Sequence, residues 1–295
     1  MKNYLELIRL SKPVGTYLLF FPCVFGIFLA FKTQSPYGSE GLLLKELIRP
    51  NFIIYYYLIL FFIGAFLMRS SGCIINDLLD KNFDKNVERT KQRPIASGKI
   101  SPKNAIIFLA FLLFLAFLVL IQFNNFTILL GLLSLLLVGT YPLMKRITYY
   151  PQIFLGITYN LGIIFASAAI IEKITIAHFI LYLGAIIWTI IYDTAYGYQD
   201  KNDDLKIGIK SMAIKFGKNP QKVFFLLTFL LLSAFFICGY LANLSFVYYL
   251  LIILAVFKIF CLIKGCDFEN PSSCQKFFLG NVNIGLIIIL AFLFS

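Results

Sequence analysis

The chain has 295 residues, of which 60% are hydrophobic, and its mean hydropathy is +0.86. Such a composition leaves too little polar surface to cover a soluble globule of this length, and it predicts an integral membrane protein. The formal net charge of +12 invites a nucleic-acid interpretation, but the excess is spread over loops that flank apolar stretches, with no soluble domain to present a binding face. We therefore expect no nucleic-acid partner.

Nine apolar stretches follow one another along the chain, each near the length of about 20 residues that crosses a bilayer as a helix. They cover residues 13–31, 52–71, 104–122, 126–144, 152–171, 176–194, 221–242, 246–264 and 277–294. None alternates with a period of two residues, which argues against a barrel. We predict an all-α polytopic membrane protein that forms a single transmembrane domain over residues 1–295.

The distribution of basic residues predicts the orientation, because basic loops resist translocation. With the N-terminus inside, 22 of the 26 Lys and Arg residues fall on the inner side, and only Lys32, Lys45, Arg49 and Lys173 fall outside. An odd number of spans puts Ser295 outside as well. We expect a multi-pass protein of the inner (cytoplasmic) membrane with a cytoplasmic N-terminus.

The stretch from Cys73 to Gly98, CIINDLLDKNFDKNVERTKQRPIASG, interrupts the apolar sequence with four acids and a run of bases. Asn76, Asp80 and Asp84 are four residues apart, so on a helix they stack along one face at about 6 Å per step, with Asp77 beside them. Stacked carboxylates repel one another. A hard divalent cation such as Mg²⁺ would compensate them, and it also binds the phosphate oxygens of substrates.

A plain alternative for this stretch is a solvated helix end with no metal. In that case the acids would pair with basic residues close by in the sequence, which are Lys81, Lys85, Arg89 and Lys91. The carboxylate clusters contain no His or Cys, which argues against zinc or another soft metal.

A second acidic run, YDTAYGYQDKNDD, ends the sixth apolar stretch and contains Asp193, Asp200, Asp203 and Asp204. Asp193 directly follows WTIIY, at the edge of the membrane, where an unpaired carboxylate is costly and therefore favours a functional interpretation. Both acidic runs fall on the predicted inner side, with long, charged loops after them. Together they predict one metal–diphosphate site at the cytoplasmic face.

Basic residues accompany both acidic runs, as the developing charge of a diphosphate leaving group would require. They are Lys12, Arg89, Arg93, Lys145, Arg146, Lys206 and Lys210. Ordinary enrichment of inner loops in basic residues explains any one of them equally well. Their coincidence with the acids favours a site.

Three segments resemble the motifs of the UbiA-type membrane prenyltransferases, in the same order and over nearly the whole chain. They are NDLLDKNFDKNVERTKQRPIASG, YPLMKRITYYPQ and YDTAYGYQDKNDDLKIGIKS, and the third is similar to the branch that prenylates 4-hydroxybenzoate. The resemblance implies nine transmembrane helices around a central cavity with cytoplasmic cap loops. It also implies transfer of a polyprenyl group from polyprenyl diphosphate to the carbon ortho to the hydroxyl of 4-hydroxybenzoate, in ubiquinone biosynthesis and within membrane lipid.

The resemblance assigns roles to residues by motif position. Asn76, Asp80 and Asp84 would hold one Mg²⁺, and Asp200 and Asp204 another. Two catalytic residues are expected. Asp77 would act from behind the metal ligands, and Asp193 would orient or deprotonate the phenol. The expected substrate-binding residues are Lys12, Arg89, Arg93, Lys145, Arg146, Tyr196 and Lys210.

Two alternatives stay open at this point. One is a related prenyltransferase with another aromatic acceptor, a menaquinone-type naphthoate or a haem, because the residues do not fix the acceptor. The other is an ion-coupled transporter, whose acids would coordinate ions. A transporter would be expected to carry acids near mid-span or in broken helices, whereas these acids gather at one membrane boundary.

Overall fold

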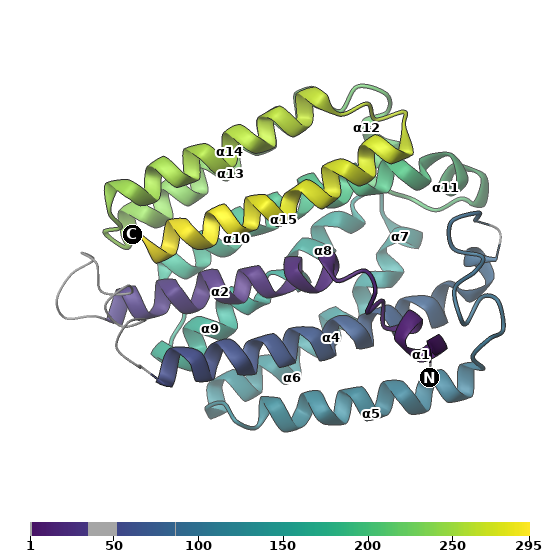
Figure 1. Ribbon diagram of the computed structural model, residues 1–295, viewed down its shortest axis with the longest axis horizontal. Helices are drawn as coiled ribbons and strands as arrows, with labels where there is room; N and C mark the ends of the chain where they lie inside the picture. The colour runs from purple at the N-terminus through teal and green to yellow at the C-terminus, as the bar shows by residue number, and fades with distance from the viewer. Residues whose placement is uncertain (1, 35–51, 86) are drawn as a thin grey trace.

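The structure is a computed structural model that describes residues 2–34, 52–85 and 87–295. Within those ranges the secondary structure is helical, without a strand, which confirms the all-α prediction (Figure 1). Among the residues that the structure describes, nine helical stretches are long and apolar enough to cross a membrane, and each overlaps one predicted stretch. The predicted outer loop at residues 32–51 lies almost entirely outside the described residues.

The long helices run side by side as one bundle (Figure 1). In chain order they are α2 (Val14–Gln34), α4 (Phe52–Asp84), α5 (Pro102–Leu120), α6 (Asn125–Thr140), α8 (Pro151–Tyr159) with α9 (Leu161–Ile171), α10 (Ile176–Gly197), α13 (Gln221–Leu241), α14 (Phe246–Gly265) and α15 (Pro271–Leu293). The short elements are α1 (Lys2–Leu7), η1 (Tyr141–Leu143), α7 (Met144–Ile147), η2 (Tyr198–Asp200), α11 (Lys201–Ile207) and α12 (Met212–Phe216).

Side-chain caps fix where several of these helices begin. Ser101 accepts a hydrogen bond from the backbone N of Asn104 at 3.3 Å, and Asn124 accepts one from the backbone N of Thr127 at 2.9 Å. Such caps satisfy amide groups that a helix start leaves without a partner. They explain why the predicted and observed starts of α5 and α6 differ by only one or two residues.

Two helices extend further than the apolar pattern predicts. α4 continues to Asp84 rather than stopping near residue 71, so residues 72–84, beyond the predicted apolar stretch, are also helical. α10 reaches Gly197 and passes through η2 into α11. Polar residues can continue a helix where their side chains find partners, and here they do, as described below. The four-residue spacing of Asn76, Asp80 and Asp84 therefore lies on one real helix.

The fifth span is broken in the middle. Asn160 separates α8 from α9, and its Nδ2 donates to the carbonyl O of Gly156 and to Oγ1 of Thr189 on α10, both at 2.8 Å. The side chain thus satisfies groups that the break would otherwise leave without partners. Nearby, a Cβ at Gly26 on α2 would lie 2.8 Å from the Cβ of Ala166, so glycine lets α2 and α9 approach closely.

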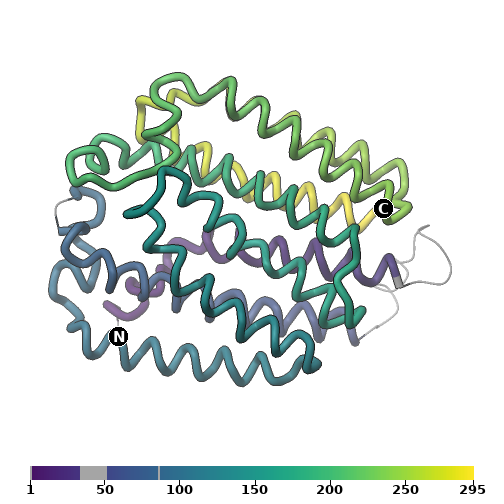
Figure 2. The backbone as a smooth tube through the Cα atoms, turned by 180° about the vertical axis from the view of Figure 1, so that it is seen from behind, coloured from purple at the N-terminus to yellow at the C-terminus, as the bar shows by residue number. Residues whose placement is uncertain are grey.

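α10 lies at the centre and packs against α13, α8 and α15, with Trp188 fully buried. The two chain ends lie at opposite ends of the bundle, as Figures 1 and 2 show from the two sides. The end near the N-terminus also carries α7, α11 and α12, together with the loop that follows α4 (Figure 1). We call it the motif end, because all three sequence motifs meet there.

Candidate active site at the motif end of the bundle

Asp80 lies at the junction of the first two motifs. Its carboxylate is buried, with 5% of the residue exposed, and it forms an ion pair with Nζ of Lys145. Nη2 of Arg146 lies 3.8 Å from Oδ1 of Asp80 and donates to the backbone carbonyl of Leu79 at 2.8 Å. The helix α4 and the η1–α7 segment are therefore joined by charge.

Asp77 and Asp84 share a second set of bases. Arg9 donates to both carboxylate oxygens of Asp77, at 2.6 Å from Nη2 and 3.3 Å from Nη1. Nη1 of Arg93 lies 3.3 Å from Asp77 and 2.9 Å from Oδ2 of Asp84. Burial opposes the charge of Arg9, but Asp77 outweighs this and raises the pKa of the Arg9 guanidinium, which therefore stays charged.

The third motif joins the first through Arg89. Its Nε donates to Oδ1 of Asp200 at 2.7 Å, its Nη2 pairs with Oδ2, and its Nη1 donates to the hydroxyl of Tyr196 at 3.1 Å. The guanidinium also lies 5.4 Å from the centre of the Tyr196 ring. Asp204 lies close enough to interact electrostatically with Asp200, Lys145 and Arg89. Arg89 and Lys145 thus face acids of both clusters.

Three further predicted residues do not contact the acids of the site in this structure. Nδ2 of Asn76 donates to the hydroxyl of Tyr141 at 2.9 Å, beside the second motif. Lys210 donates to the carbonyl of Ile147 at 3.1 Å, so it joins the second and third motifs away from the acids. Lys12 is exposed and takes part in no ion pair of residues 2–34, 52–85 and 87–295. The expectation that Lys12 contacts the site gains no support from this placement.

The alternative of a solvated helix end does not fit this arrangement. The acids of α4 are buried, and two of them pair with bases from distant segments: Arg9 is 68 residues from Asp77, and Lys145 is 65 residues from Asp80. Asp84 pairs with Arg93, nine residues on. Of the local bases named for that alternative, Lys91 pairs with Glu88 instead, and Arg89 reaches across to the other cluster. The acids and bases form one interlinked group.

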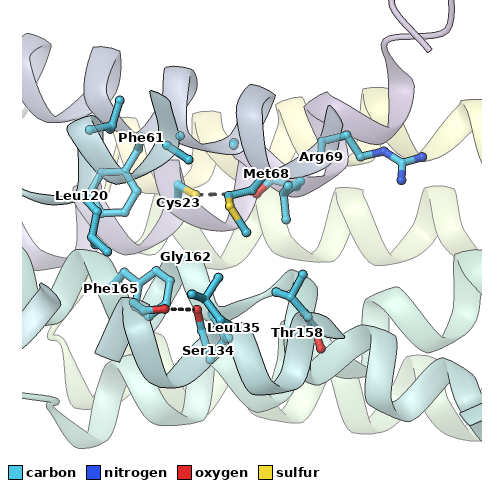
Figure 3. Close-up of a pocket in the computed structure, with 18 of the residues that line it drawn as sticks. Cys23, Phe61, Met68, Arg69, Leu120, Ser134, Leu135, Thr158, Gly162 and Phe165 are labelled. Atoms are coloured by element: carbon cyan, nitrogen blue, oxygen red, sulfur yellow. Dashed lines mark hydrogen bonds between the residues drawn. The ribbon is translucent and has the colours of Figure 1, made fainter. Parts of the chain in front are cut away.

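A cavity of about 250 Å³ extends into the bundle beside this group. Its walls come from α2, α4, α5, α6, α8 and α9, and they are mostly apolar. In Figure 3, Phe61, Leu120 and Phe165 lie at one end and Arg69 at the other. Tyr141 and Gly72 also line it, so the cavity reaches the helix α4 one turn before Asn76. We call it the apolar cavity.

Arg69 is a site residue that the sequence interpretation missed. It lines the apolar cavity from within α4, and its guanidinium lies 5.9 Å from the centre of the Tyr159 ring. A Cβ at Gly15 would lie 2.7 Å from its Nη2, so glycine at that position makes room for it. Asp193 on α10 lies within electrostatic reach of Arg69. A basic residue inside an apolar span was a usable signal, because such residues are costly and commonly functional.

The donor groups at the motif end suit a hard cation. The described residues gather no group of three or more His, Cys, Asp or Glu side chains that could hold a metal ion, and Asp77, Asp80 and Asp84 each face a base. Mg²⁺ needs only one or two carboxylates and completes its shell with water and phosphate oxygens. Oδ1 of Asp80 is buried without a hydrogen-bond partner, which is the kind of oxygen that a bound cation would satisfy.

The fold and the site together define a membrane-embedded helical protein with an acid- and base-rich mouth to an apolar cavity. A profile of the UbiA prenyltransferase family matches residues 19–287, and the chain belongs to this family. The fold is similar to that of an apo UbiA homologue from Aeropyrum pernix, with a TM-score of 0.73 at 20% identity over 92% of this chain and 96% of the other. A UbiA homologue from Archaeoglobus fulgidus bound to DMAPP and Mg²⁺ has a TM-score of 0.69 at 17% identity, over 99% of both chains.

Curated relatives are much more similar in sequence. The mitochondrial 4-hydroxybenzoate polyprenyltransferase of Drosophila melanogaster is 41% identical over 290 residues, which cover 98% of this chain and 70% of the relative. The protein of that name from Homo sapiens is 39% identical over 291 residues, which cover 98% of this chain and 74% of the relative. The prediction of the family from three short motifs is thereby confirmed.

Proposed function

We propose that the protein transfers a polyprenyl group from a polyprenyl diphosphate to the carbon ortho to the hydroxyl of 4-hydroxybenzoate, as a step of ubiquinone biosynthesis. The observation that carries the proposal is the apolar cavity, which runs from a deep aromatic end to the half-buried guanidinium of Arg69, near the clustered acids and bases. An apolar chain, a diphosphate and an aromatic acid each have a matching environment there. The names of the curated relatives support the same acceptor.

The donor reacts by breaking the bond between its allylic carbon and the diphosphate oxygen, and the electron pair leaves with the diphosphate. Lys145 and Arg93, which contact Asp80 and Asp84, would stabilise this charge, and charge stabilisation of this kind is usually the largest catalytic term. Mg²⁺, when bound, would neutralise part of the diphosphate charge. The residues that would hold it are Asn76, Asp80, Asp84, Asp200 and Asp204.

The acceptor needs a partner for its carboxylate and one for its phenol. Arg69 offers a half-buried guanidinium at the cavity, with which the carboxylate of the acceptor would form an ion pair. Asp193 is our candidate for orienting or deprotonating the phenol. The ortho carbon then attacks the allylic centre, and loss of the ring proton restores aromaticity. The apolar walls hold the rest of the prenyl chain and exclude water, which would otherwise capture the allylic cation.

For the location of the reaction, we propose only which side of the membrane the site faces. The motif end carries the N-terminus and most of the basic residues. Because basic loops resist translocation, this end would face the side of the membrane on which the chain is synthesised. The curated relatives are named mitochondrial. We therefore replace the expected bacterial-type cytoplasmic membrane by a more general statement: the motif end of the protein faces the side from which the protein is inserted into its membrane.

The function is tested with purified protein in liposomes, Mg²⁺, polyprenyl diphosphates and three acceptors: 4-hydroxybenzoate, a dihydroxynaphthoate and a haem. Products are identified by mass. We expect a prenylated 4-hydroxybenzoate and an equal amount of diphosphate. If only the naphthoate or only the haem gives a product, the proposed acceptor is wrong. If no diphosphate is released in a Mg²⁺-dependent way, the proposal of a prenyltransferase is wrong.

A further inference from the structure

Arg9 has a backbone conformation that arginine rarely adopts. Its φ is +58°, in the left-handed region, and it closes the short helix α1, with its backbone N donating to the carbonyl of Glu6 at 3.0 Å. Glycine is the usual residue at such a helix end, because it lacks the Cβ that makes this region costly. A residue held there against its preference is maintained by its surroundings, and such positions cluster at functional sites.

The surroundings of Arg9 fix both its backbone and its side chain. Leu7 and Ile8 are buried against α4, α5 and the loop after α4, in a cluster with Leu67, Ile74, Ile95, Ile100, Ala105 and Leu112. This anchor brings Arg9 to Asp77, whose side chain is only 1% exposed. Both oxygens of Asp77 accept from the guanidinium fork, the geometry that gives an arginine–carboxylate pair its strength and direction.

The pair matters because Asp77 has a competing partner. Nη1 of Arg93 lies 3.3 Å from Asp77 and at 2.9 and 3.1 Å from the two oxygens of Asp84. Without Arg9, the buried carboxylate of Asp77 would need another cation, and Arg93 is the one within reach. Movement of Arg93 toward Asp77 would draw it from Asp84, an expected metal ligand, and from the diphosphate.

We propose that Arg9 is a positioning residue: by satisfying Asp77, it leaves Arg93 free to face Asp84 and the diphosphate. The inference rests on the proposed function, because it assumes that Asp84 and Arg93 serve a metal–diphosphate site. It also assigns Asp77 a role as the link between two arginines rather than as a group that touches substrate. The N-terminal segment thereby becomes part of the site, although it lies outside all three motifs.

The test replaces Arg9 by glycine, which suits the positive φ and removes the side chain. In detergent-solubilised, full-length protein, binding of Mg²⁺ with inorganic pyrophosphate is measured by calorimetry, alongside thermal unfolding without Mg²⁺ and the kcat and KM of prenyl transfer. We expect pyrophosphate affinity and kcat to fall by about 10- to 100-fold, as for other residues that orient metal ligands. The unfolding temperature should change little, because glycine relieves the backbone.

A double variant separates positioning from a general structural role. If Arg9 acts through Asp77, the two residues form one interacting unit. Adding Arg9→Gly to Asp77→Asn should then lower pyrophosphate affinity little more than Asp77→Asn does alone. Glu172→Gly is the matched control, since Glu172 has a φ of +59° at the other end of the bundle and should leave pyrophosphate binding unchanged.

Wild-type pyrophosphate affinity in Arg9→Gly, or losses that simply add to those of Asp77→Asn, would overturn the proposal. If Arg9→Gly does not fold, Arg9→Lys decides instead: lysine supplies a point charge without the fork, so reduced affinity supports the proposal and unchanged affinity overturns it. Asp80→Asn is measured in parallel. Normal pyrophosphate binding in Asp80→Asn would remove the proposed function itself, whereas normal binding in Arg9→Gly alone removes only this inference.

Discussion

The motif end and the apolar cavity adjoin each other but are organised by different forces. At the motif end, buried carboxylates are held by arginine and lysine from segments far apart in the chain, such as Asp77 and Arg9, which are 68 residues apart. In the cavity, shape alone defines the space, with walls of aliphatic and aromatic side chains and gaps at glycines. Function at the first region should therefore depend on charge, and at the second on volume.

Arg69 is where the two regions meet. It lies in the apolar part of α4 but carries a charge like the residues of the motif end. It lines the cavity at the end opposite Phe61 and Phe165. A half-buried cation inside an apolar span is costly unless an anion pairs with it. This difference makes substitutions informative, because charge removal and volume change should affect different steps of the reaction.

The largest effect is expected for Asp80→Asn, which keeps the shape and removes the charge at the centre of the motif end. We expect prenyl transfer at saturating Mg²⁺ to fall by about 10²- to 10³-fold, the size of effect seen when one group that stabilises a transition state is removed. The control is Asp203→Asn, a half-buried acid whose ion pair is with Lys206, three residues on. Near-normal turnover of Asp80→Asn would show that charge does not organise the site.

A smaller and more selective effect is expected for Arg69→Leu. Loss of a charged hydrogen bond to the acceptor carboxylate corresponds to about 2 to 3 kcal/mol, or roughly a 30- to 160-fold higher KM for 4-hydroxybenzoate. The KM for the prenyl diphosphate should hardly change. As a control, 4-hydroxybenzamide lacks the carboxylate, so its transfer rate should be nearly the same with Arg69 or leucine. An equal loss with both acceptors would contradict the assignment of Arg69.

Much of the fold could be predicted from the sequence, because a span needs about 20 apolar residues wherever it lies. The observed helices begin and end close to the predicted stretches, except where polar side chains found partners. α4 runs on to Asp84 because its acids meet Arg9, Arg93 and Lys145. A hydropathy pattern contains no record of such distant partners, so it ended the helix too early.

The candidate site was predictable in its residue types but less so in its pairings. Four-residue spacing placed the acids of α4 on one face, and the inner-loop bases were named. The spacing could not indicate that Asp77 faces Arg9 or that Lys210 contacts Ile147 rather than the acids. Arg69 was counted only among the basic residues of the inner side. The individual roles of all these residues stay predictions until variants are measured.

For the apolar cavity, a change of volume should alter chain-length preference without altering the chemistry. Leu135 on α6 lines the cavity, so Leu135→Trp would fill part of its volume of about 250 Å³. We expect transfer from long polyprenyl diphosphates to fall by about tenfold relative to the shortest donor. Leu136 is the next residue, is 70% exposed and does not line the cavity, so Leu136→Trp is the matched control. Equal losses for all donor lengths in Leu135→Trp would contradict the prediction that cavity volume sets the preference for chain length.

The smallest effect tests a polar contact that lies in neither region. Nε1 of Trp188 donates to Oδ1 of Asn281 at 2.8 Å, joining α10 to α15 inside the core. Asn281→Ala leaves a buried donor unsatisfied and should lower the free energy of unfolding by about 1 kcal/mol, measured by thermal unfolding in detergent. Replacing both partners, as Trp188→Phe with Asn281→Leu, should recover most of that loss, because no polar group is then left unpaired. Prenyl transfer should stay normal in both variants. Reduced transfer at unchanged stability would mean that this contact serves the site, and the division between charge at the motif end and packing elsewhere would fail.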